Sequence, residues 1–110
     1  MKLTKDIIKT IRETIEANDY ELDYTYIGIR IQEQPFELGA LDHNSVVWDD
    51  GEETDEELNG ACAINHTMLD AINCEYVGDH IAIIAGDSVE YGEDAGEIII
   101  ADAEVISVIC

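Results

Sequence analysis

The stretch "TKDIIKTIRETIEANDYELDYTYIGIRIQ", residues 4–32, decides the fold because its hydrophobic pattern changes partway along. Residues 4–17 place four isoleucines at helical spacing, which predicts an amphipathic helix with one apolar stripe. Those isoleucines are Ile7, Ile8, Ile11 and Ile15. Thr4 suits the N-cap, and Asn18 with Asp19 ends the helix. We therefore expect a helix over 4–17 that packs on a sheet.

Residues 20–32 predict a strand, because they are rich in aromatic and β-branched side chains. Strand alternation would place Tyr20, Tyr24 and Tyr26 on one face and the isoleucines on the other. The tyrosine rings either pack beneath the helix and across strands or form a recognition surface. Pro35 ends the strand.

The remainder of the chain predicts several short elements. They are a strand at 45–48, a helical turn at 55–59, a strand at 61–64, a helix over 66–73, a buried strand at 80–86, an acidic connection at 87–96, and one bent or two short strands over 97–110. One continuous helix over 55–73 is the rival interpretation. The mixed order predicts an α+β fold: a single small domain over residues 1–110, with a mostly antiparallel sheet packed by an N-terminal amphipathic helix and a second short helix.

Composition restricts the class of protein. Hydrophobic residues make up 46% of the chain and charged residues 28%, so it has enough apolar side chains for a core. No apolar run approaches the roughly 20 residues of a membrane span, and charges interrupt the N-terminus too often for a signal peptide. Three cysteines, an odd number, favour reduced thiols. We expect a soluble cytoplasmic protein.

Charge is distributed unevenly along the chain. The net charge is −21, and all five Lys and Arg residues lie within the first 30 positions. Residues 31–110 hold twenty acids and no Lys or Arg. Such a surface repels nucleic acid and anionic membranes and attracts basic proteins or cations. We therefore expect neither direct nucleic-acid binding nor membrane binding.

Metal binding is one interpretation of the acids and of the Cys and His residues. No acidic loop matches the calcium-binding EF-hand pattern, and a looser calcium or magnesium site would use Asp49, Asp50 and Glu52. Cys62, His66, Cys74 and His80 are ligand types that suit tetrahedral zinc. Their spacing, C-x3-H-x7-C-x5-H, lacks the close cysteine pair of the common zinc motifs. Zinc or calcium is therefore the alternative interpretation.

Catalysis finds no support in the motifs. The chain has no glycine-rich phosphate loop and no G-x-S-x-G nucleophile pattern. A thiolate nucleophile needs an electropositive setting, whereas this chain is strongly acidic. We predict that the protein is not an enzyme.

Two acidic stretches are the candidate partner-binding regions. The first is "WDDGEETDEE", residues 48–57, and the second is "GDSVEYGEDAGE", residues 86–97. The candidate residues within them are Asp49, Asp50, Glu52, Glu53, Asp55, Glu56, Glu57, Asp87, Glu90, Glu93, Asp94 and Glu97. Small acidic domains need a net charge of magnitude only about 2–8 for solubility, so this excess indicates a further role.

By size, single-domain organisation and acidity, these stretches resemble phage-encoded DNA-mimic inhibitors of the anti-CRISPR and anti-restriction type. The resemblance implies a non-enzymatic inhibitor that binds the nucleic-acid-binding surface of a host defence nuclease, such as a CRISPR effector, and blocks target DNA. The alternatives are a small zinc- or calcium-binding module and an acidic domain from a mobile element or a salt-adapted organism. The Ile-rich C-terminal strand offers an edge through which a homodimer could form.

Overall fold

The structure is a computed structural model of the 110-residue chain that describes residues 4–40, 45–48, 62–68, 79–91 and 97–110. Helix α1 (Lys5–Ala17) confirms the predicted N-terminal helix. Its N-cap is Thr4, whose side-chain hydroxyl accepts a 3.2 Å hydrogen bond from the backbone amide of Ile7. The apolar stripe is buried toward the sheet, with Ile11 and Ile15 completely or nearly completely covered.

The second helix differs in place from the prediction. Helix α2 (Tyr20–Asp23) occupies residues that we predicted to begin the first strand. Asp19 adopts a left-handed conformation with φ of 54°, which turns the chain out of α1 and into α2. One helical turn brings Tyr20 and Tyr24 to the same side, with their ring centroids 6.1 Å apart. The prediction of a strand from residue 20 was therefore wrong in its first part.

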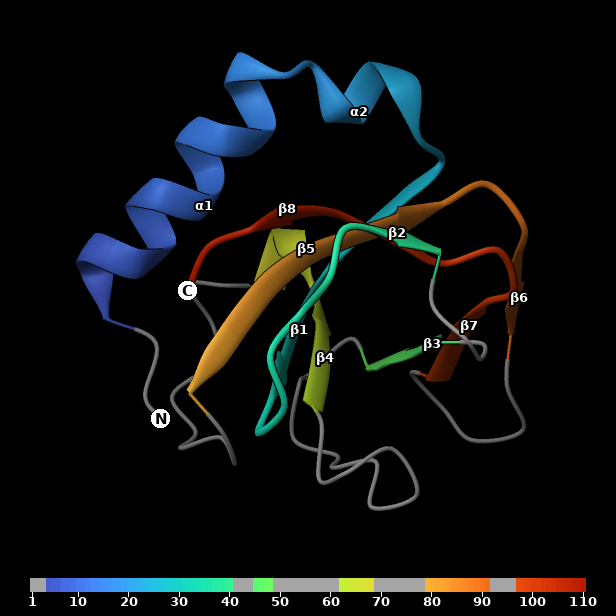
Figure 1. The fold of residues 1–110 in the computed structure, drawn as a ribbon. Coiled ribbons are helices and arrows are strands. Elements are labelled where there is room, and N and C mark those ends of the chain that lie inside the picture. Colours follow the sequence, from blue (N-terminus) through green and yellow to red (C-terminus); the bar gives the residue numbers. More distant parts are fainter. Residues whose placement is uncertain (1–3, 41–44, 49–61, 69–78, 92–96) are drawn as a thin grey trace.

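The strands and the short 3-10 helix have the following bounds: β1 Tyr26–Gln32, β2 Gly39–Ala40, β3 Ser45–Trp48, β4 Cys62–Asn65, η2 His66–Met68, β5 His80–Gly86, β6 Val89–Tyr91, β7 Glu97–Ile100 and β8 Glu104–Val108. They form one sheet in the order β2-β8-β5-β1-β4-β3-β7-β6 (Figure 1). Only the β3–β4 pair is parallel among the pairs in the described part of the chain. The predicted α+β class with a mostly antiparallel sheet is confirmed.

The observed bounds of the strands agree with the predicted bounds to different degrees. β3 and β5 have the predicted bounds, and β4 lies one residue later than predicted. The C-terminal segment forms two short strands, with the break at Ala101 and Asp102. β6 was not predicted within the acidic connection. A continuous helix over 55–73 was wrong, because β4 interrupts it; the turn at 55–59 and residues 69–73 lie outside the described residues.

Two apolar clusters cover the two faces of the central strands. Between α1 and the sheet lie the isoleucines of β1 and the odd-numbered side chains of β5, such as Ile81 and Ile83. The opposite face is covered by Ala82, Ile84 and Val105, with Ile100 packed among them. β1 and β5 are therefore buried on both faces, which explains why they are nearly continuous apolar runs.

The sheet is strongly curled. β5 and β6 are joined by only Asp87 and Ser88, although β6 lies at the far edge of the sheet order. The backbone amide of Ala101, after β7, donates a 2.8 Å hydrogen bond to the carbonyl of Ser88. The far edge of the sheet therefore returns to the end of β5, and β6 and β7 lie on the opposite side of the view from α1 (Figure 1). No helix in the described part of the chain is both long enough and apolar enough to cross a membrane.

Candidate functional site

An acidic corner forms where the β5–β6 connection meets the start of β8. We use this name for the carboxylates of Asp87, Asp102 and Glu104. The curled sheet brings their backbones together, because β8 pairs with β5 and the backbone amide of Ala101 donates to the Ser88 carbonyl. The carboxylates lie on different faces: Asp102 lies beside Gly86 and Ile100, whereas Glu104 contacts Tyr24 on the α1 face. Each carboxylate accepts a hydrogen bond from a residue distant in the sequence or from the neighbouring turn.

Asp87 is held by the residue that precedes β1. Its Oδ1 accepts hydrogen bonds from the Thr25 backbone amide at 2.8 Å and from the Thr25 hydroxyl at 3.1 Å. Thr25 is adjacent to Tyr26, which pairs with Gly86 in the β1–β5 ladder. The ladder therefore fixes where the Asp87 carboxylate lies, although the side chain is exposed to solvent.

Asp102 is held by two backbone amides. Its Oδ1 accepts from the Ser88 amide at 2.9 Å, and both carboxylate oxygens lie within 3.2 Å of the Asp87 amide. These hydrogen bonds, that from Ser88 first and those from Asp87 next, lower the pKa of Asp102 below its ordinary value because they stabilise the charged form. Asp102 therefore presents a fixed negative charge at neutral pH.

Glu104 is held by a phenol. The hydroxyl of Tyr24 donates a 2.8 Å hydrogen bond to Glu104 Oε1. This hydrogen bond, followed by partial burial and the nearby negative charges, raises the pKa of Tyr24 to about 12. The sequence alone suggested no special role for Tyr24 in positioning an acid.

The structure places the predicted partner-binding residues only in part. Asp87 is in the acidic corner, and Glu90 is exposed on β6. Glu97 begins β7. Nine predicted residues lie outside the described part of the chain: Asp49, Asp50, Glu52, Glu53, Asp55, Glu56, Glu57, Glu93 and Asp94. Asp102 and Glu104, which complete the corner, were not among the predicted site residues.

Arg30 contributes almost no positive charge to the surface. It is the only Lys or Arg after residue 12 in the sequence, and it is only 2% exposed. Its position in β1 directs it to the face opposite α1, where it pairs across the ladder with Ala82, and its Nε donates a 2.9 Å hydrogen bond to Gln32 Oε1. The exposed Lys and Arg side chains of the described residues are consequently Lys5, Lys9 and Arg12, all on α1.

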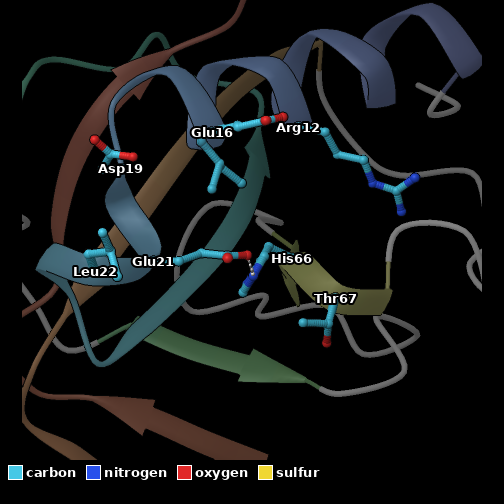
Figure 2. A pocket seen from close by; sticks show the side chains of 8 residues that line it. Arg12, Glu16, Asp19, Glu21, Leu22, His66 and Thr67 are labelled. Atoms are coloured by element: carbon cyan, nitrogen blue, oxygen red, sulfur yellow. Dashed lines mark hydrogen bonds and ion pairs between the residues drawn. The ribbon is translucent and has the colours of Figure 1, made fainter.

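A second candidate site is a groove between the two helices and η2, which we call the helical groove. Its volume is about 520 Å³. The lining residues are Arg12, Ile15, Glu16, Asp19, Glu21, Leu22, His66 and Thr67 (Figure 2). A volume of this size falls within the range of roughly 300–1,000 Å³ that is typical of ligand sites.

His66 lies in the wall of the groove, and both of its ring nitrogens face oxygen atoms. Nδ1 lies 3.0 Å from the backbone carbonyl of Ile27, and Nε2 lies 3.1 Å from Glu21 Oε1. Since a carbonyl only accepts, Nδ1 donates, and Nε2 donates to Glu21 when the ring is protonated. The imidazole is therefore occupied in tying α2 and η2 to β1, which leaves neither nitrogen directed at a substrate.

The residues proposed for zinc are not brought together by the described strands. His66 lies beside Ile27, whereas His80 pairs with Gln32, so the two histidines are at opposite ends of β1. Five residues of strand separate these ends by roughly 16 Å, so His66 and His80 cannot ligate one ion. Cys62 lies in β4 opposite Ile31, and Cys74 lies outside the described residues. Within the described part of the chain no three His, Cys, Asp or Glu side chains form a group suited to a metal ion.

Comparison of the chain with protein-family models, curated proteins and solved structures finds no match.

Proposed function

We propose that this protein is a non-enzymatic acidic inhibitor that binds the nucleic-acid-binding surface of a basic protein in the cytoplasm and excludes DNA from it. The class of partner is a host defence nuclease of the CRISPR-effector type. The observation that carries the proposal is the burial of Arg30, because it removes the last cation from the surface beyond α1. Among the described residues beyond α1, a basic partner then meets exposed carboxylates and no exposed Lys or Arg.

The exposed acids of the described residues beyond α1 extend over both ends of the sheet. They are Asp19, Glu21, Asp23, Glu33, Glu37, Asp79, Asp87, Glu90 and Asp102. Duplex DNA presents one negative charge per roughly 1.7 Å of its axis, and its binding proteins meet this charge with arrays of Lys and Arg. An acidic domain of this size offers such arrays an alternative ligand.

The acidic corner supplies the rigidity that a phosphate mimic needs. A flexible acidic side chain loses about 0.5–1.5 kcal/mol of conformational entropy when a partner immobilises it. Hydrogen bonds from Thr25, from the Ser88 amide and from Tyr24 already order the three carboxylates before binding. Each carboxylate has about four acceptor positions, so it can still accept from an incoming Lys or Arg.

Competition for DNA cleavage tests this function. Guide-loaded CRISPR effectors and restriction enzymes would each cleave a labelled DNA duplex with and without the protein, at 50 and 300 mM salt. We expect inhibition of at least one nuclease that weakens at the higher salt and is relieved by excess DNA. No inhibition of any nuclease by folded protein, or inhibition that excess DNA does not relieve, would contradict the proposal.

A matched pair of charge reversals separates a mimic face from net charge alone. Glu90→Lys changes an exposed acid beside the acidic corner, and Glu33→Lys makes the same change beyond the opposite end of β1. Both variants have the same net charge. If the corner contacts the partner, Glu90→Lys weakens inhibition by at least tenfold more than Glu33→Lys. Equal effects would show that the corner has no special part.

A further inference from the structure

Strands β5, β6, β7 and β8 form one long hairpin that is bent in its middle. The ladder between β5 and β8 includes the pair Ala85–Glu104, and the ladder between β6 and β7 includes the pair Val89–Ile100. Counting four residues on from Ala85 and four back from Glu104 leads to Val89 and Ile100, so the register is the same on both sides of the bend. The two ladders are therefore parts of one hairpin, in which β6 and β7 form the distal end.

The bend is held by the side chain of Asp102. In Figure 1 the chain turns between β5 and β6 and turns again between β7 and β8. Here the amide of Ala101 donates to the carbonyl of Ser88, whereas the amides of Ser88 and Asp87 donate to the Asp102 carboxylate at 2.9 and 3.1 Å. A Cβ atom at Gly86 would collide with this carboxylate, so the glycine permits the close approach. Asp102 thus ties the two sides of the hairpin together where the chain changes direction.

The distal end of the hairpin joins the rest of the sheet through a narrow seam. β7 pairs with all four residues of β3, and among the described residues β3 joins β4 at one pair, Trp48–Ile64. By contrast, β1 pairs with β5 at seven positions and with β4 at four. Because cross-strand pairs are the contacts that stabilise a sheet, the seam between β3 and β4 is weaker than either junction of β1. We use the name outer sheet for β3, β6 and β7.

The outer sheet covers one face of the central strands. Ile100, at the end of β7, is fully buried and packs among Ala82, Ile84 and Val105 on the face opposite α1. Among the described residues, this cluster holds fewer buried side chains than the cluster beneath α1. Segments with few buried apolar contacts and few ladder positions open at a lower cost in free energy than the core does.

We propose that the outer sheet opens transiently as one unit that pivots at the bend, and that Asp102 holds it closed. Opening separates β3 from β4 and moves Ile100 away from Ala82 and Ile84, while β1, β5 and β8 stay paired. It also carries the amides of Asp87 and Ser88 away from the Asp102 carboxylate. The inference goes beyond the proposed function and does not rest on it, because the motion belongs to the free protein.

Hydrogen exchange of single amides, followed by NMR at several low urea concentrations, tests the proposal on the wild-type protein. We expect the hydrogen-bonded amides of β3, β6 and β7 to share one free energy of opening and one urea dependence, both smaller than those of the β1 and β5 amides. Their protection factors should be lower by about tenfold or more. If these strands exchange only through global unfolding, as β1 and β5 do, the proposal is wrong. Separate openings of the three strands would also overturn it.

A matched pair of variants tests the part played by Asp102. Asp102→Ala removes the carboxylate at the bend, and Glu33→Ala removes an exposed carboxylate beyond the opposite end of β1, so both variants have the same net charge. We expect Asp102→Ala to reduce the protection of the outer-sheet amides by about tenfold more than that of the β1 amides. Glu33→Ala should reduce neither group selectively.

Two results would contradict the role of Asp102. Equal losses of protection in all strands would show that Asp102 contributes only to global stability. Losses confined to the amides of Asp87 and Ser88 would show that it caps a turn and does not hold the outer sheet. The exchange series on the wild-type protein tests the opening itself and does not depend on whether either variant folds.

Discussion

The hydroxyl of Tyr24 donates a 2.8 Å hydrogen bond to the carboxylate of Glu104, a residue 80 positions later in the chain. The contact ties the segment after α2 to the start of β8. It also places a negative charge at the acidic corner with the help of a group that is itself neutral at physiological pH.

The first prediction concerns alkaline pH. The pKa of Tyr24 is raised to about 12, chiefly by the hydrogen bond to Glu104, from an ordinary value of 10.0. The folded state favours the protonated phenol. The hydrogen bond from Tyr24 to Glu104 therefore contributes fully to the free energy of unfolding below pH 10, and this contribution is lost as the pH rises toward 12. Tyr24→Phe should be less stable than the wild type by about 1 kcal/mol at pH 8.

Urea unfolding at pH 8 and pH 11.5 measures this difference. Both proteins lose stability at high pH through other groups, so the difference between them is the quantity of interest. The difference should shrink at pH 11.5. A gap that stays constant would show that the phenol contributes through packing alone.

The second prediction concerns acid. Hydrogen bonds from the amides of Ser88 and Asp87 lower the pKa of Asp102, so its contribution is complete above the ordinary pKa of about 3.8 and is lost as the pH falls below that value. Asp102→Ala should lower the urea midpoint at pH 7, and Asp102→Asn, which keeps one acceptor oxygen, should lower it less. As the pH falls below the ordinary pKa of Asp102, the difference between each variant and the wild type should shrink. Equal destabilisation at pH 7 and pH 2 would exclude a role for the charge.

Local patterns explain how much of this fold could be predicted. α1, β3 and β5 had clear periodicity and caps or short apolar runs, and each formed close to its predicted bounds. α2 could not be found in this way, because Tyr20 and Tyr24 also suit a strand. Their conformation depends on distant contacts, such as the 3.1 Å hydrogen bond from Tyr20 to the carbonyl of Ile106. Ile106 lies at an irregularity in the β5–β8 register that no sequence pattern announces.

The sequence predicted that the candidate sites are acidic but not which side chains lie together in them. Sequence spacing identified Asp87 and Glu90 as acids of a turn-rich stretch, yet Thr25, which holds Asp87, lies 62 positions away. The helical groove depends on α2 and on the contact of His66 with Glu21, 45 positions apart, so local patterns could not indicate it. Of the residues proposed for zinc, His66 and His80 lie at opposite ends of β1 although only 14 positions separate them in the sequence, and Cys74 lies outside the described residues.

The third prediction concerns the junction that curls the sheet. Gly86 ends β5 against Ile100 and Asp102, and a Cβ atom at this position would collide with both side chains. Gly86→Ala should therefore destabilise the protein by about 1–3 kcal/mol through overpacking. Chemical denaturation monitored by tryptophan fluorescence measures the loss. Adding Ile100→Ala should relieve part of the clash. The double variant should therefore be more stable than the sum of the two single losses of stability predicts. Simple additivity would show that Ile100 is not the obstacle.

The fourth prediction concerns the basic residues of α1. The exposed cations of the described residues all lie on this helix, on the opposite side of the view from β6 and β7 (Figure 1). A basic partner that contacts the acidic surface would be repelled by Lys5 and Lys9, so it should bind with that face turned away. Lys5→Gln combined with Lys9→Gln should leave inhibition of the nuclease unchanged or strengthen it by about two- to threefold through the long-range field. Arg12 is retained because it lines the helical groove. Inhibition of the nuclease is measured at 50 mM salt for both proteins. A tenfold loss of inhibition in the variant would contradict the prediction and place the N-terminal half of α1 in the interface. The partner surface would then need acidic as well as basic groups.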